Sequence, residues 1–173
     1  MRRLRYQVAA SLDGYIAGPH GEFDWITMDP DLDFAALFAQ FDTAVMGRKT
    51  FLAMLQQGGS GAMPGLDVVV FSRTLRAADY PAVSIVDSDP GETVRLLKEK
   101  PGKDIWLFGG GELFRTLLAA GVVDTVEPAV VPVLLGAGIP MLPPPTARTA
   151  LSLSGHRLYP QSGIVLLEYT VTR

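Results

Sequence analysis

The sequence predicts an α/β fold whose central sheet is mixed and mostly parallel. Between residue 4 and about residue 119, apolar runs of strand length alternate with segments of helical periodicity, which is typical of a parallel sheet covered by helices. The run 66–71 is nearly continuously apolar, as expected for a strand covered on both faces. The last two strand-like segments flank a turn at 159–163 and alternate apolar with polar residues, which predicts an antiparallel hairpin.

About eight strands and four helices account for this pattern. The expected strands are 4–10, 43–46, 66–71, 83–86, 105–108, 122–131, 150–158 and 164–171. The first helix should open in the segment 29–33, with Asp29 or Asp31 as its cap and Pro30 near its first turn. The other three helices should start at Gly47, at Asp89 and directly after the glycines 109–111.

Composition places the chain among globular proteins. It has 173 residues, enough for a full hydrophobic core, and 48% of them are apolar while 19% are charged. We therefore expect a single domain over 1–173. The absence of cysteine excludes disulfides, thiolate metal sites and cysteine nucleophiles. His20 and His156 are far apart in the sequence and have no partner at a ligand spacing, so we expect no metal site.

Charge and hydropathy limit the classes of partner. The net charge is −3 and the sequence has no basic stripe, which argues against a nucleic-acid partner. No apolar run approaches the roughly 20 residues that a membrane-spanning helix needs. The basic start, with Arg2 and Arg3, is not followed by the long apolar segment of a signal peptide. We expect a cytoplasmic protein without a membrane partner.

Three consecutive glycines, Gly109 to Gly111, stand between an apolar run and a helical pattern. Glycines at such a turn leave backbone N–H groups accessible, and the dipole of the following helix adds partial positive charge. This combination favours a phosphate or pyrophosphate group. A tight strand-to-helix turn without any ligand is the alternative, because a glycine cluster alone is a weak motif.

Two further strand ends carry groups that suit an anion. Gly47 is followed by Arg48, Lys49 and Thr50 at a helix start, and residues 72–74 (Ser-Arg-Thr) follow the strand 66–71. Guanidinium and hydroxyl groups are common partners of phosphate. Together with the glycine triplet, these turns suggest a dinucleotide that has several phosphates.

The Rossmann scheme does not describe these turns. That scheme places G-x-G-x-x-G after an early strand and an acidic residue about 20 positions later. The segment 109–114 lacks the final glycine and occurs late in the chain. We therefore reject a Rossmann site.

Small and aromatic residues near the N-terminus suggest space for a flat ligand. Ala9 and Ala10 end the first strand, and they either leave room for a ring or allow neighbouring strands to pack closely. Phe23, Trp25 and Ile26 occupy a loop, which either closes over a ligand or packs onto the core.

The motifs together resemble one known family. They are residues 11–17 (SLDGYIA), 45–51 (VMGRKTF), 71–74 (FSRT), 108–113 (FGGGEL) and 131–136 (VPVLLG), in that order. Their order is similar to that of the dihydrofolate reductase superfamily. The closer resemblance is to the C-terminal reductase domain of the bifunctional riboflavin-biosynthesis deaminase-reductase and to its stand-alone bacterial relatives. The chain lacks the zinc-deaminase pattern. The resemblance covers essentially the whole chain and implies a three-layer fold with a mixed eight-stranded sheet.

The resemblance also implies NADPH as cofactor and assigns its binding residues. The pyrophosphate would be held by Gly109, Gly110, Gly111, Glu112 and Leu113, through backbone groups. Gly47, Arg48 and Thr50 would form a second phosphate turn, and Ser72 and Arg73, with Arg48, would take the adenosine 2′-phosphate. Ala10, Ile16 and Ala17 would line the nicotinamide slot.

The substrate side is implied by one acidic position. Counted back from Gly47, Asp31 falls where dihydrofolate reductases keep the acid that binds the pteridine and assists its protonation, although Asp29 and Asp33 lie beside it. We expect an NADPH-dependent reductase of a C=N or C=O group in a small nitrogen heterocycle. Its substrate would be pterin- or folate-like, or a riboflavin-precursor pyrimidine such as 5-amino-6-(5-phosphoribosylamino)uracil.

Two further interpretations remain open at this point. A non-catalytic nucleotide-binding or regulatory protein on the same fold is the alternative function, because fold does not determine activity. We also expect a homodimer, since the closing strands and the segment 130–135 are apolar and riboflavin-type relatives are often dimers. The alternative is that these strands only fill the core.

Overall fold

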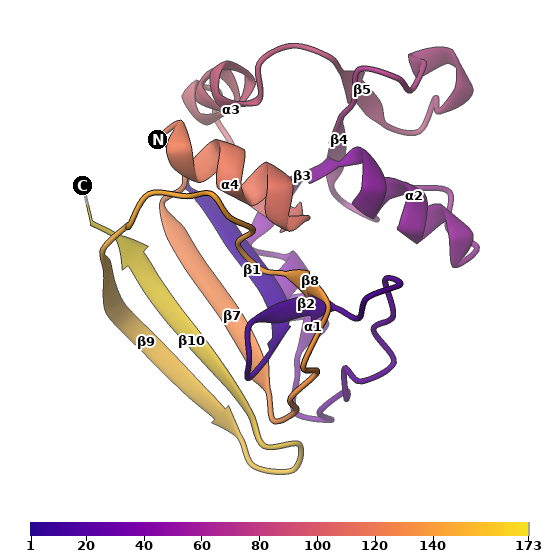
Figure 1. Ribbon diagram of the computed structural model, residues 1–173. Coiled ribbons are helices and arrows are strands. Elements are labelled where there is room, and N and C mark those ends of the chain that lie inside the picture. Colours follow the sequence, from indigo (N-terminus) through magenta and orange to yellow (C-terminus); the bar gives the residue numbers. More distant parts are fainter. Residues whose placement is uncertain (173) are drawn as a thin grey trace.

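The fold is built on one eight-stranded sheet in the order β5-β4-β3-β6-β1-β7-β10-β9 (Figure 1). The six strands from β5 to β7 run parallel to one another, whereas β10 pairs antiparallel with both β7 and β9. This computed structural model describes residues 1–172. The arrangement confirms the predicted mixed sheet and its C-terminal hairpin.

Helices and short strands connect the sheet strands. The longest helix has ten residues, and within residues 1–172 no helix has the length and apolar character to cross a membrane. The elements are β1 (Leu4–Ser11), β2 (Tyr15–Ala17), α1 (Phe34–Phe38), β3 (Phe41–Gly47), α2 (Arg48–Gln56), β4 (Asp67–Phe71), a 3₁₀ helix (Ala77–Asp79), β5 (Ser84–Val86), α3 (Pro90–Glu99), β6 (Asp104–Gly109), α4 (Gly111–Ala119), β7 (Thr125–Val131), β8 (Ile139–Pro140), β9 (Leu151–Tyr159) and β10 (Ile164–Val171).

Helices cover both faces of the sheet and make three layers. On one face α3 and α4 lie next to each other (Figure 1), and Tyr6 of β1 stacks on Phe114 of α4 with ring centroids 3.9 Å apart. On the other face, Phe51 of α2 packs in a buried cluster with Met46 and Val70. Alternate residues of each strand therefore face different helix layers, which explains why the central strands are apolar on both sides.

The first helix starts later than the sequence predicts. It begins at Phe34, and Asp33 is its cap because the Asp33 carboxylate accepts a hydrogen bond from the Ala36 N–H at 2.9 Å. The prediction that Asp29 or Asp31 caps this helix is wrong. The Asp29 carboxylate instead accepts hydrogen bonds from the N–H groups of Asp31 (2.9 Å) and Ser162 (2.8 Å). Asp29 therefore binds the β9–β10 turn and does not cap a helix.

A second, two-stranded sheet was not expected. β2 pairs antiparallel with β8, and both strands lie outside the eight strands that the sequence predicts. Strands of three and two residues are too short to produce a recognisable alternation. The pairing brings residues 15–17 onto the segment that packs against the start of α4.

The contact of Asp29 with the β9–β10 turn should depend on pH. Hydrogen bonding from Ser162 lowers the pKa of Asp29 below its ordinary value. Because the depressed pKa belongs to the folded state, this contribution to stability is complete above the unfolded pKa of about 3.9 and is lost as the pH falls below it.

We expect the difference in unfolding free energy between the wild type and Asp29→Asn to shrink as the pH is lowered from 7 to about 3.5. Urea unfolding at several pH values measures this difference. Asp24→Asn, an exposed acid in the same loop, is the matched control. A wild-type to Asp29→Asn difference that does not change with pH contradicts the assignment.

Candidate functional site

The predicted anion-binding turns meet at one edge of the sheet. Parallel strands end at a common edge, and β4, β3, β6 and β1 are consecutive neighbours there. Met46 pairs with Gly109 and Gly47 pairs with Phe71, so the three turns are side by side. At a strand spacing of about 4.8 Å, β4 lies about 14 Å from β1. The edge therefore presents an extended row of groups rather than one compact site.

The glycine triplet forms the start of α4. Gly110 is the N-cap and makes no side-chain cap bond, so the N–H groups of the first helical turn, from Gly111 to Leu113, lack intrahelical acceptors. The Glu112 carboxylate pairs with Arg115 at 2.6 Å, and its negative charge would repel a phosphate, so the backbone N–H is the group of Glu112 that suits an anion. Gly111 is required for packing, because a Cβ there would lie 2.5 Å from the Pro140 carbonyl oxygen.

The start of α2 has the same open form. Gly47 is its N-cap without a side-chain bond, and Arg48 and Lys49 are exposed in its first turn. Thr50 faces the neighbouring turn, since a Cβ placed on Gly110 would lie 3.2 Å from the Thr50 Oγ1. The structure therefore brings Gly47, Thr50 and the glycine triplet together.

The other two helices differ in this respect. Asp33 caps α1 and Asp89 caps α3, each through its carboxylate. Only α2 and α4, which follow the neighbouring strands β3 and β6, have uncapped starts among the four α-helices in residues 1–172. Two adjacent N-termini with free N–H groups suit a diphosphate, so the residues present fit the phosphates of a dinucleotide.

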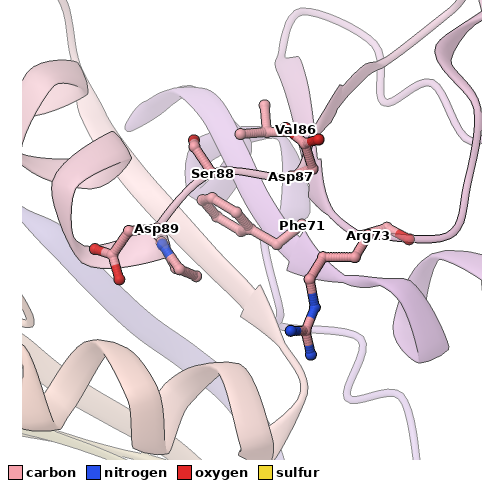
Figure 2. Close-up of a pocket in the computed structure, with 8 residues that line it drawn as sticks. Phe71, Arg73, Val86, Asp87, Ser88 and Asp89 are labelled. Carbon is pink, nitrogen blue, oxygen red and sulfur yellow. The ribbon is translucent and has the colours of Figure 1, made fainter.

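The third turn borders a cavity of about 340 Å³ at the ends of β4 and β5 (Figure 2). Ser72 is buried and Arg73 is exposed. The Ser72 hydroxyl accepts bonds from the N–H groups of Thr74 (3.2 Å) and Leu75 (3.0 Å), and its oxygen lies 3.5 Å from the Thr74 hydroxyl oxygen. Asp87 and Asp89 line the same cavity.

The residues predicted to line a nicotinamide slot lie on the side of β6 that is away from β3 and β4. Ala10 is buried near the end of β1, while Ile16 and Ala17 are half-buried in β2. Because β2 pairs with β8, Ile16 and Ala17 lie beside Pro140, whose carbonyl oxygen is close to Gly111. The predicted phosphate and nicotinamide residues are thus linked through β8.

Asp13 is a residue of this region that the sequence analysis did not assign. Its carboxylate accepts bonds from the Ser11 hydroxyl (2.6 Å) and from the N–H groups of Leu135 (3.1 Å) and Gly136 (2.7 Å). The Ser11 bond, and then the two backbone bonds, hold the pKa of Asp13 below its ordinary value. Asp13 therefore holds the β1–β2 turn against the segment before β8. The signals for it in the sequence are the Asp-Gly pair and its position in the motif 11–17.

The three candidate acids differ in their structural roles. Asp29 is buried and bonded to two backbone N–H groups, and Asp33 caps α1. Asp31 is exposed, and its carboxylate accepts one bond, from the Gln161 side-chain amide at 3.3 Å. Asp31 therefore lies at the β9–β10 turn and is the acid of the three that is not committed to the backbone.

Comparison with known proteins identifies the fold and the family of this chain. The uncharacterized protein YyaP of Bacillus subtilis (strain 168) is 37% identical over 179 residues, covering 97% of this chain and 94% of YyaP. A structure from Shewanella sp. PV-4, of a protein assigned to riboflavin biosynthesis, superposes with a TM-score of 0.84 at 24% identity over 99% of each chain. Dihydrofolate reductase from Enterococcus faecalis, complexed with NADP(H), superposes with a TM-score of 0.68 at 17% identity, over 99% of this chain and 97% of the enzyme.

These identities make the two structures evidence for the fold alone. They confirm the dihydrofolate reductase-like architecture that the motifs predicted. The match to a sequence family is more specific, because it extends over residues 2–165. The chain belongs to the RibD C-terminal domain family.

Proposed function

We propose that this protein is an NADPH-dependent reductase of a small nitrogen heterocycle. The observation that carries the proposal is the pair of uncapped helix starts on neighbouring strands, Gly47 before α2 and Gly110 before α4. Family membership supports it. The substrate would present a C=N or C=O group in a pterin- or folate-like ring, or in a pyrimidine such as 5-amino-6-(5-phosphoribosylamino)uracil.

The chain's own groups would bind and orient. NADPH supplies the hydride when bound. Backbone N–H groups of residues 111–113 and of the first turn of α2 would hold the pyrophosphate, and Thr50 lies between them. Ser72 and Arg73 would receive the adenosine end, and Ala10, Ile16 and Ala17 would contact the nicotinamide ring.

Asp31 would serve as the proton relay to the substrate. Asp29 and Asp33 are occupied by backbone N–H groups, whereas Asp31 has a single bond to an exposed amide. If Asp31 acts this way, Asp31→Asn should lower kcat while leaving the affinity for NADPH unchanged.

Calorimetric titration tests the cofactor. Wild-type protein should bind NADPH below millimolar concentration. Gly47→Ala should weaken that binding about tenfold, because its methyl group would project between the two phosphate turns. The fold should tolerate this change, since the added Cβ would lie 3.9 Å from the Leu113 Cβ and the Gly47 φ is −83°. No NADPH binding by the folded wild type contradicts the proposal.

A substrate panel separates the reductase from a non-catalytic nucleotide-binding protein. Oxidation of NADPH, followed by absorbance, should occur with at least one pterin, folate or pyrimidine compound. Binding of NADPH without oxidation across the panel would favour the non-catalytic alternative, which the exposed position of Asp31 motivates.

We also propose that the chain forms a homodimer through β9 and β10. Leu151, Leu153 and Leu158 are 43%, 54% and 58% exposed. They pair across from Val171, Tyr169 and Val165, so all three point to one face of the sheet, and no helix lies in front of these strands in Figure 1. The solvent-accessible surface area of the chain is 9532 Å². A folded monomer of this mass has about 8,200 Å², so this chain leaves more surface uncovered than a monomer of its size usually does.

Light scattering on a sizing column should give about twice the chain mass of 18.6 kDa. The double variant Leu153→Lys/Leu158→Lys should run as a monomer, because two buried charges would oppose association. Leu96→Lys, at an exposed leucine of α3, is the control and should remain dimeric. A wild-type mass of 18.6 kDa at micromolar concentration contradicts the proposal.

A further inference from the structure

The cavity at the ends of β4 and β5 contains opposite charges. Arg73 lines one side of it, and the turn from Asp87 to Asp89 lines the other. Figure 2 shows the ring of Phe71 between Asp89 and Arg73, with the Arg73 guanidinium extending away from the acidic turn. Two acidic residues and one arginine therefore line a cavity of about 340 Å³.

The groups of the cavity differ in how far they are already bonded. Asp89 accepts the Glu92 N–H as the cap of α3, and the Ser88 hydroxyl is bonded to the Thr93 hydroxyl at 2.8 Å. For the Arg73 guanidinium and the Asp87 carboxylate, the structure records no hydrogen bond or ion pair within residues 1–172. Arg73 and Asp87 are thus the charged groups of this cavity that are available to a ligand.

These two groups select different forms of an adenosine ribose. A guanidinium binds a 2′-phosphate through charge-assisted hydrogen bonds. A carboxylate accepts hydrogen bonds from ribose hydroxyls, as acidic residues do in NAD sites, and it repels a 2′-phosphate. A site that used only Ser72 and Arg73 would strongly prefer the phosphorylated form, whereas Asp87 offsets part of that preference.

We propose that Asp87 is a specificity-determining residue that lets this cavity accept the adenosine ribose of NADH as well as that of NADPH. The proposal rests on the cofactor function proposed above and changes its expected selectivity. Arg73 provides affinity for the 2′-phosphate, and Asp87 provides an acceptor for the 2′-hydroxyl.

Calorimetric dissociation constants for NADPH and NADH test this assignment in the full chain. For the wild type, the two constants should agree within about tenfold. Asp87→Asn should increase the preference for NADPH by about threefold to tenfold, because one repulsive charge is removed from a partly hydrated site. Arg73→Gln should weaken NADPH binding about tenfold and leave NADH binding nearly unchanged.

Asp67→Asn is the matched control. Asp67 is also an exposed acid and begins the same strand, β4, at the opposite edge of the sheet. Asp67→Asn changes the net charge by the same amount as Asp87→Asn but at a distance from the cavity. The ratio of the NADPH and NADH dissociation constants should therefore stay within twofold of the wild-type ratio. The effect of Asp87→Asn should also diminish in 0.5 M salt, as expected for a screened charge.

The outcomes separate the two proposals. The role of Asp87 is overturned if the wild type binds NADPH tightly and prefers it to NADH by more than a hundredfold. It is also overturned if Asp87→Asn and Asp67→Asn give the same ratio of NADPH to NADH dissociation constants. Either result leaves the reductase proposal in place. Failure of both dinucleotides to bind the folded wild type overturns the cofactor function and the role of Asp87 with it.

Discussion

Replacing Glu127 with alanine is expected to lower the free energy of unfolding by about 3–5 kcal/mol. The side chains of Arg5 and Glu127 are only 9% and 3% exposed, and two hydrogen bonds of 2.8 and 2.7 Å join them. The Thr125 hydroxyl donates a third bond to Glu127, at 2.6 Å. Removal of the carboxylate leaves the buried guanidinium with the Gln40 side-chain oxygen at 2.7 Å and the more distant Asp104 carboxylate at 3.5 Å. The loss of its closest counter-charge is the source of the destabilisation.

Chemical denaturation of the wild type and of Glu127→Ala measures this effect. The double variant Arg5→Met/Glu127→Met is the informative control, because it removes both charges and keeps most of the volume. It should recover most of the stability that Glu127→Ala loses. If the double variant is as unstable as Glu127→Ala, the lost stability comes from the missing ion pair itself and not from an unpaired charge.

Replacing Gly138 with alanine is expected to weaken NADPH binding about tenfold to hundredfold. A Cβ at Gly138 would lie 2.2 Å from the Ala17 carbonyl oxygen and 3.2 Å from the Tyr15 Cγ. The first of these is a backbone atom and cannot rotate away, so β8 must move from β2. Because the proposed nicotinamide slot is bordered by Ile16 and Ala17, this displacement should alter the cofactor site.

The same substitution should lower the unfolding free energy by about 1–3 kcal/mol, as overpacking does. Gly121→Ala is the control for stability. Gly121 follows α4 with a φ of +68°, where a side chain is strained, but a Cβ there would meet no atom within 4 Å. Gly121→Ala should therefore lose stability without losing NADPH affinity. Equal affinity of Gly138→Ala and wild type would show that the β2–β8 contact does not shape the cofactor site.

Much of this fold could be predicted because its signals are local. The continuous apolar run 66–71 indicates a strand covered on both faces, and β4 (Asp67–Phe71) has four buried residues out of five. The sequence predicts helix starts at Gly47 and directly after the glycines 109–111. The structure has α2 starting at Arg48 and α4 starting one residue earlier than predicted, at Gly111. In each case the residues that indicate the element lie within the element itself or directly next to it.

The errors arose where a distant contact replaced a local rule. Asp29 is a good N-cap candidate, yet its carboxylate bonds to Ser162, 133 positions away. The β2–β8 pair depends on strands too short to be read from the sequence, and Gly138 allows the close approach of their backbones. Local propensity is a weak preference that such tertiary contacts override.

Local sequence patterns were sufficient to predict the types of the elements and the mixed character of the sheet, and they suggested three turns that suit an anion. Those features depend on side-chain period and on glycine, which act over a few residues. Three other features became visible only in the folded chain: β3 and β6 are neighbours, Asp87 lines the same cavity as Arg73, and Arg5 pairs with Glu127. Strand order and buried pairing are set by how the whole chain buries its apolar surface. The paired residues Arg5 and Glu127, for example, are 122 positions apart in the sequence.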